Sequence, residues 1–252
     1  MEDNELYIPD MIFPSDNILE IPSLRLDVQP RSIERPWICF GEQRRTFNMG
    51  NNGTLHFYTD DYRFNSVYDH PEKILQHHPN SIVEPNFSLF ADTPVAFGMQ
   101  AVYKKRAIGR MMQEKGIGVF VDLNVNSKFY KLNLIGVPTG YQYFCTRGYE
   151  DRPHYLEYEY NIAKMIAGDK PIFFVVYGGG EKIKQLCRVM GLVYITPIIA
   201  IKNKIKALEK ISDTIAFGKS TAELISLKSD KLFMNQVQNF SNKKIKTEDN
   251  YE

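Results

Sequence analysis

Apolar and polar residues alternate along the middle of the chain in blocks that predict strands followed by helices. Blocks rich in Val, Ile, Phe and Tyr predict six strands, at 55–60, 81–90, 117–123, 141–148, 171–180 and 192–197. The stretches between them include three predicted helices, at 93–116, 154–169 and 181–191. Because the strands are apolar throughout, they indicate a mostly parallel sheet that is covered on both faces.

The number of strands decides between architectures. Six candidate strands are too few for a complete eight-stranded barrel, so the first choice is an α/β fold with a partial or distorted (β/α) barrel. An open doubly wound sheet is the alternative. Both folds place ligands at the carboxyl ends of the strands, and the residues just after each strand are therefore the first candidates for a site.

Composition divides the chain into four regions. Residues 1–53 carry many turn signals and are expected to form an N-terminal arm or cap, whereas 54–197 hold the α/β core domain. Residues 198–240 predict amphipathic C-terminal helices. The polar segment 241–252 predicts a disordered tail.

Charge and cysteine content limit the expected binding partners and the expected cellular compartment. The chain has 31 Lys and Arg against 30 Asp and Glu, so its net charge gives no sign of a nucleic-acid or membrane binder. Cys39, Cys145 and Cys187 are too far apart to predict a zinc ribbon or a disulfide framework. No apolar run is long enough to span a membrane, and the acidic N-terminus lacks a secretory signal. These features predict a cytoplasmic protein.

Several polar residues follow the predicted strands and would converge on one rim. Carboxylates in that position suit acid–base chemistry or a divalent cation, which makes Asp60, Asp61 and Asp122 the catalytic candidates. Arg147 would add a partner for an anion, and the glycines before the last predicted helix would offer backbone N–H groups to a phosphate. The binding candidates are Arg63, Asn86, Ser88, Asp92, Arg106, Arg147, Gly178, Gly179 and Gly180.

Structural alternatives stay open for several of these residues. Asp60 or Asp61 would also serve as a turn or N-cap residue paired with Arg63. Asp92, directly before Thr-Pro, suits the cap of the long helix, and a sharp strand-to-helix turn alone would explain the three glycines.

Four segments carry a resemblance to a known family: FYTDDYRFNSVYDHPEK, VEPNFSLFADTPVAFGMQAVYKKRAIGRMMQEKGIGVFVDLN, FCTRGY and VVYGGG. Over residues 54–197 the chain resembles the family known as domain of unknown function 4417, whose members often come from phages, prophages and other mobile elements. Asn86 stands where the family pattern has Asp, and Lys104 where it has Arg. The resemblance brings no established reaction. It implies a mobile-element origin and, if the protein is phage-encoded, a location in the cytoplasm of the host cell. The residues that match are Asp60, Asp61, Tyr62, Arg63, Phe64, Pro85, Phe87, Ser88, Asp92, Pro94, Tyr103, Arg106 and Gly109.

Three functions are compatible with these features. The first is a phage protein that handles nucleic acid in replication or DNA processing. Its support is the mobile-element origin of the family, the basic stretch 104–110 and the many aromatic residues that could stack on bases. The second is a metal-assisted enzyme acting on a phosphorylated small molecule or nucleotide at the strand ends. The third is a non-catalytic host-interaction protein. DNA or a nucleotide is the expected partner in the first two.

Overall fold

The computed structural model describes residues 7–33, 35–42, 53–203 and 206. The chain divides into two units, Met1–Ile195 and Thr196–Glu252, and the first contains the whole sheet. The expected tail, and all of the expected C-terminal helices beyond residue 206, lie outside the described residues.

Seven strands form one sheet in which every neighbouring pair is parallel. Their spatial order follows the chain without any reversal. A doubly wound sheet would reverse its order at a switch point, so the structure confirms the partial (β/α) barrel instead. The strands are β1 (Trp37–Cys39), β2 (Thr54–His56), β3 (Ser81–Val83), β4 (Gly118–Asp122), β5 (Tyr143–Arg147), β6 (Phe173–Tyr177) and β7 (Val193–Ile195).

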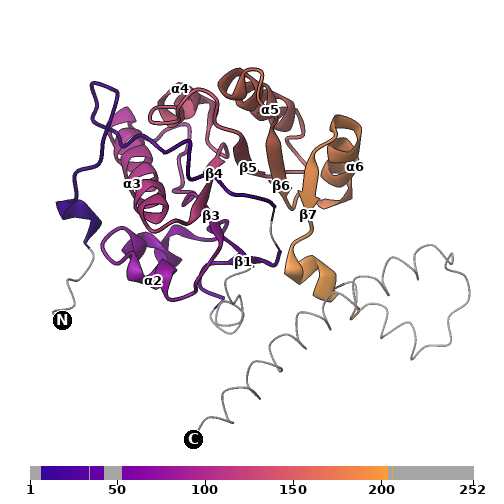
Figure 1. Ribbon diagram of the computed structural model, residues 1–252. Coiled ribbons are helices and arrows are strands. Elements are labelled where there is room, and N and C mark those ends of the chain that lie inside the picture. Colours follow the sequence, from indigo (N-terminus) through magenta and orange to yellow (C-terminus); the bar gives the residue numbers. More distant parts are fainter. Residues whose placement is uncertain (1–6, 34, 43–52, 204–205, 207–252) are drawn as a thin grey trace, which may run out of the picture. The chain divides into compact units, whose positions relative to one another are not determined.

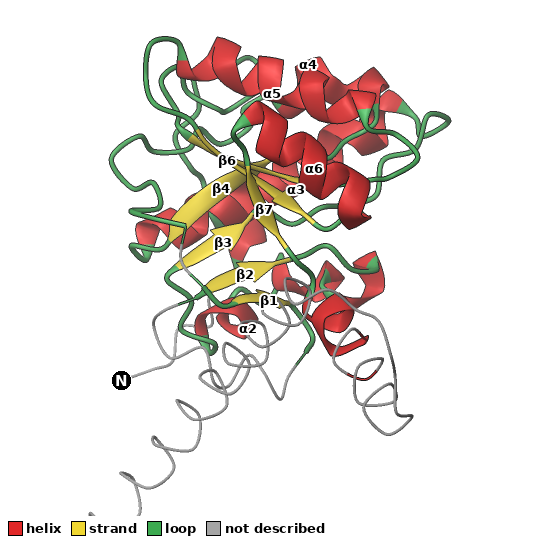
Figure 2. Cartoon of the chain, turned by 90° about the vertical axis from the view of Figure 1, so that its right-hand side faces the viewer, coloured by secondary structure: helices red, strands yellow, loops and turns green. Residues whose placement is uncertain are grey.

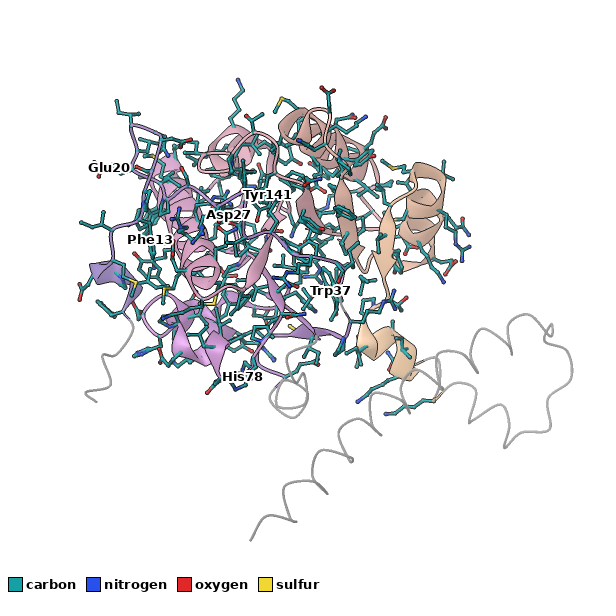
Figure 3. All side chains as sticks on the ribbon, in the orientation of Figure 1. Phe13, Glu20, Asp27, Trp37, His78 and Tyr141 are labelled. Carbon is teal, nitrogen blue, oxygen red and sulfur yellow. The ribbon has the colours of Figure 1, made fainter. Side chains whose placement is uncertain are left out.

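Ring contacts across the sheet show how strongly it curls. The rings of His56 on β2 and Tyr177 on β6 have centroids 4.1 Å apart, although three strands separate them. Adjacent strands lie about 4.8 Å apart, so the same residues in a flat sheet would be roughly 19 Å apart. Trp37 on β1 likewise reaches Phe120 on β4 at 5.4 Å. The strands form the curved fan seen in Figure 2, and Trp37 lies among them in Figure 3.

Helices cover the outer face of this half-barrel and follow one another in an arc around the strands (Figure 1). They are α2 (Glu72–Leu75), α3 (Val95–Glu114), α4 (Tyr130–Asn133), α5 (His154–Ala167) and α6 (Gly180–Met190), with short 3-10 helices at Ile8–Asp10, Asp61–Arg63, Asn65–Val67 and Ser127–Phe129. Burial of apolar surface between the layers holds α3 to the sheet. The packed residues are Ile38, Leu55, Ile82 and Val119 of the strands and Ala107, Ile108, Met111 and Met112 of α3.

The structure corrects three expectations. The region expected to form an arm or cap contributes β1, which pairs with β2 and raises the number of strands in the sheet to seven. The strand expected at 81–90 ends at Val83, because Pro85 has no N–H to give to a ladder. Asp92 does not cap α3: the N-cap is Pro94, no side chain caps there, and Thr93 Oγ1 instead accepts from the backbone N–H of Phe90.

Candidate functional site

A buried carboxylate ends β4 and ties four segments together. Asp122 is fully buried, and its Oδ1 accepts from the hydroxyl of Tyr58 at 3.0 Å and from the backbone N–H of Asn124 at 3.2 Å. Its Oδ2 accepts from Lys105 Nζ at 3.0 Å and from Asn86 Nδ2 at 2.8 Å. Each carboxylate oxygen therefore already has two donors. This geometry makes Asp122 a residue that positions its neighbours.

A second buried ion pair lies directly beside the first. Glu84 and Arg106 are both fully buried and pair through Glu84 Oε1, while Glu84 Oε2 accepts from the backbone N–H of Asp122 at 3.2 Å. The guanidinium of Arg106 also donates to the carbonyl oxygens of Asn133 at 2.6 Å and Ile135 at 3.1 Å. Arg106 thus fixes the segment after β4, and its side chain points into the protein.

The basic stretch of α3 does not form one charged face. Lys105 and Arg106 are buried in the two ion pairs, whereas Lys104 lies over the ring of Tyr68, 5.2 Å from its centroid. Arg110 is held by Glu114 at 2.7 Å and by a backbone carbonyl. The continuous basic face that an extended nucleic-acid track would need is not present on this helix.

A pocket of about 210 Å³ opens next to the Asp122 centre. Its walls come from the loops that follow β3, β4 and β5 and from α4 and α5, so it lies at the carboxyl ends of the strands. Asn124 links the walls: its Nδ2 donates to Asn86 Oδ1 at 3.2 Å and to the hydroxyl of Tyr149 at 3.3 Å. The lining residues are Asn86, Phe87, Ser88, Leu89, Phe90, Ala91, Asn124, Val125, Asn126, Tyr130, Tyr149, Arg152, Tyr155 and Glu159.

Tyrosine rings and guanidinium groups meet at one side of this pocket. Arg152 lies over the ring of Tyr149, 4.1 Å from its centroid, and 5.7 Å from that of Tyr155. Arg147, a strand-end candidate from the sequence, lies 5.5 Å from the centroid of Tyr149. Cations held over aromatic faces keep their charge available for an anion while the rings offer surfaces for stacking.

Burial favours the proton-bearing form of two polar groups of the pocket. Burial and the nearby Asp122 carboxylate raise the pKa of Glu159, and this outweighs the opposing effects of Thr146 and Arg152. Burial also raises the pKa of Tyr130, whose hydroxyl has no hydrogen-bond partner among the described residues. The sequence interpretation missed both residues, because they lie on helices away from the strand ends. A signal existed in α5, where Glu159 falls on the same buried stripe as Leu156, Ala163 and Ile166.

Asp61 fastens one wall of the pocket. Its carboxylate accepts from the backbone N–H of Ser88 and from the Ser88 hydroxyl, both at 2.9 Å. Asp60 points elsewhere: its side chain is 72% exposed and its nearest cation is Arg63, 4.0 Å away. The two adjacent aspartates therefore do different work, one in holding a loop and the other in a weak surface pair.

Replacing Asp61 with alanine is expected to lower the free energy of unfolding by about 1 kcal/mol, because two charge-assisted hydrogen bonds in a partly exposed site are lost. Hydrogen exchange of the 87–91 backbone should accelerate at the same time. Asp60→Ala is the matched control and should change stability by less than about 0.5 kcal/mol. Equal effects of the two variants would contradict the role given to Asp61.

Other candidates lie outside the pocket. Asp92 is exposed, and Arg63 donates to the hydroxyl of Tyr62 at 3.3 Å. The turn of Gly178, Gly179 and Gly180 brings the loops after β5 and β6 together: Gly179 has a φ of 95°, and a Cβ there would come within 2.6 Å of the Gly148 backbone. The carboxylate of Glu150 lies beside this turn, 2.9 Å from the position a Gly180 Cβ would take.

The carboxylates do not fit the divalent cation that the sequence suggested. Among the described residues, no group of three or more His, Cys, Asp or Glu side chains is placed to hold a metal ion. Asp122 has donors on both oxygens, and Asp61 is engaged with Ser88. None of the helices that the structure describes is long and apolar enough to cross a bilayer.

Comparisons with known proteins place this site in context. A family model described as "Domain of unknown function (DUF4417)" matches residues 13–189, more than half of the chain. The "Gene 1 protein" of Mycobacterium phage D29 is 35% identical over 111 residues, 43% of this chain and 40% of that protein. The "Gene 1 protein" of Mycobacterium phage L5 is 35% identical over 112 residues, 43% of this chain and 48% of that protein. Each match thus spans less than half of the relative's length. No solved structure matches the chain.

Proposed function

We propose that this protein, which belongs to the DUF4417 family and is similar to phage gene products, binds one nucleotide unit in the pocket described above. The proposal is drawn from the pocket, because the function of the family is unknown. The unit is either a free nucleotide or a residue of a single nucleic-acid strand. A role in phage replication or DNA processing is part of this proposal.

The observation that carries the proposal is the pairing of Arg152 with Tyr149 at the pocket's edge, 4.1 Å from guanidinium to ring centroid. A nucleotide combines a flat base with an anionic phosphate, and stacking on tyrosine beside an arginine is how proteins hold such a unit. The pocket volume of about 210 Å³ lies below the usual 300–1,000 Å³ of ligand sites, which favours a single small ring system.

Charge favours local binding over a long track. The chain is nearly neutral, and two basic residues of α3 are buried in ion pairs. A protein that neutralises many phosphates needs exposed Lys and Arg along a path. The cations at this site, Arg147 and Arg152, both lie against Tyr149. This arrangement suits contact with one or two phosphates.

Calorimetric titration with AMP, CMP, GMP and UMP, and in parallel with four-nucleotide single strands, tests the proposal and separates its two sources. Tyr149→Ala is expected to weaken binding about 5- to 150-fold through the loss of one base stack. Tyr62→Ala removes an exposed tyrosine outside the pocket and should leave affinity unchanged. Absence of binding by every probe at millimolar concentration would overturn the nucleotide function.

A further inference from the structure

Two buried groups line the pocket, and one of them lacks a partner. The hydroxyl of Tyr130 is buried without a hydrogen-bond partner among the described residues. Glu159 is only 4% exposed, and its carboxyl lies near that hydroxyl and near Thr146, whose hydroxyl acts on it as a hydrogen-bond donor. Tyr130 and Glu159 line the pocket directly.

Buried polar groups without a partner, such as the Tyr130 hydroxyl, are uncommon in folded proteins, where the great majority of buried polar atoms have partners. A buried donor without an acceptor costs free energy that a bound molecule can recover by supplying the acceptor. The amides in the same pocket already have partners: Asn86 donates to Asp122, Asn124 donates to Asn86 and Tyr149, and Asn126 accepts from the backbone N–H of Lys128. Recognition of a ligand edge therefore falls to Glu159 and Tyr130.

The charges that face Glu159 favour its neutral form. The Asp122 carboxylate at the end of β4 disfavours a second negative charge nearby, and the side chains of Tyr130 and Cys145 are uncharged. The cation that faces it is Arg152, which is exposed, stacks on Tyr149 and also lies 3.6 Å from Asp151. The described side chains form no salt bridge with Glu159.

Resting on the nucleotide function above, we propose that Glu159 acts as a neutral acid that pairs with the Watson–Crick edge of adenine or cytosine. Its O–H donates to the ring nitrogen of the base, and its carbonyl oxygen accepts from the exocyclic amino group. An ionised carboxylate has no proton to donate and would instead suit the two adjacent N–H donors of guanine. The protonation state of one buried side chain thus sets the base preference.

Substitution of Glu159 with glutamine separates charge from shape. Glutamine keeps one donor and one acceptor, so Glu159→Gln should bind AMP and CMP within about threefold of the native protein, whereas Glu159→Ala should bind them about tenfold more weakly. Affinity of the native protein for AMP and CMP should fall as pH rises through the pKa of Glu159, while affinity for GMP should rise over the same range. Glu157→Gln changes an exposed neighbour on α5 and is the control for the affinity and pH measurements, which it should leave unchanged.

Infrared spectroscopy supplies a readout that needs no ligand. At neutral pH the native protein should show a protonated-carboxyl band that Glu159→Gln removes and Glu157→Gln keeps, and AMP should shift that band. Absence of this band means an ionised Glu159 and overturns the inference, even if nucleotides bind. A band that AMP leaves unchanged, or equal affinity of Glu159→Ala, also overturns it. A band with no nucleotide binding overturns both this inference and the proposed function.

Discussion

Replacing Glu84 with glutamine is expected to lower the free energy of unfolding by about 3–5 kcal/mol, because it leaves a buried guanidinium without its counter-charge. Arg106 is fully buried, and its other acceptors are two backbone carbonyls, which cannot neutralise it. Trp37, the single tryptophan of the chain and itself buried, provides the fluorescence signal for urea unfolding.

Two further variants show whether this loss comes from the uncompensated charge. Glu114→Gln removes a half-exposed carboxylate that pairs with Arg110 and Arg25, and should cost no more than about 1 kcal/mol. The double variant Glu84→Leu with Arg106→Met removes both buried charges and should be more stable than Glu84→Gln alone. A loss from Glu84→Gln as small as that from Glu114→Gln would contradict the buried ion pair.

Strand type could be predicted from the sequence because burial on both faces leaves a continuous apolar run. The β4 segment GVFVD is such a run, and all five of its residues are buried. β1 has only the three residues WIC, between Pro36 and Gly41, and gives too short a signal to be separated from an arm. The curl of the sheet depends on ring contacts such as that between His56 and Tyr177, which join residues 121 positions apart and leave no local pattern.

Reading the residues after each strand identified Asn86 and Ser88, which line the pocket, and Asp122, which lies beside it. The same reading missed the pocket residues that lie on helices, Tyr130 and Glu159. Lys105 and Glu159 lie on helices and are buried, although charged residues are rarely buried without partners. Their partners and neighbours come from other strands and loops, as with Lys105 and Asp122. The usable signal is helical periodicity, which places Glu159 on the apolar stripe of α5. This periodicity predicts that Glu159 is buried, but it does not predict that Glu159 lines a pocket.

Asp122→Asn is expected to lower the free energy of unfolding by about 3–5 kcal/mol, because it removes the counter-charge of the buried Lys105 ammonium. Asparagine also replaces one acceptor oxygen with an amino group. That group would face either the Asn86 amide or the Tyr58 hydroxyl, both of which now donate to Asp122. Urea unfolding should show the loss, and titration should show weaker nucleotide binding because Asn86 is released.

Further variants at Asp122 test whether this carboxylate only positions its neighbours or takes part in catalysis as a metal ligand. If Asp122 only organises its neighbours, adding Lys105→Met to Asp122→Asn should recover part of the stability, because no buried charge then lacks a partner. Mg²⁺ should leave the unfolding temperature of the native protein unchanged, since both oxygens of Asp122 already accept hydrogen bonds. A stabilisation by Mg²⁺ that Asp122→Asn abolishes would instead make this carboxylate a metal ligand. The strand-end site would then be a metal-assisted catalytic centre, with the nucleotide as its substrate.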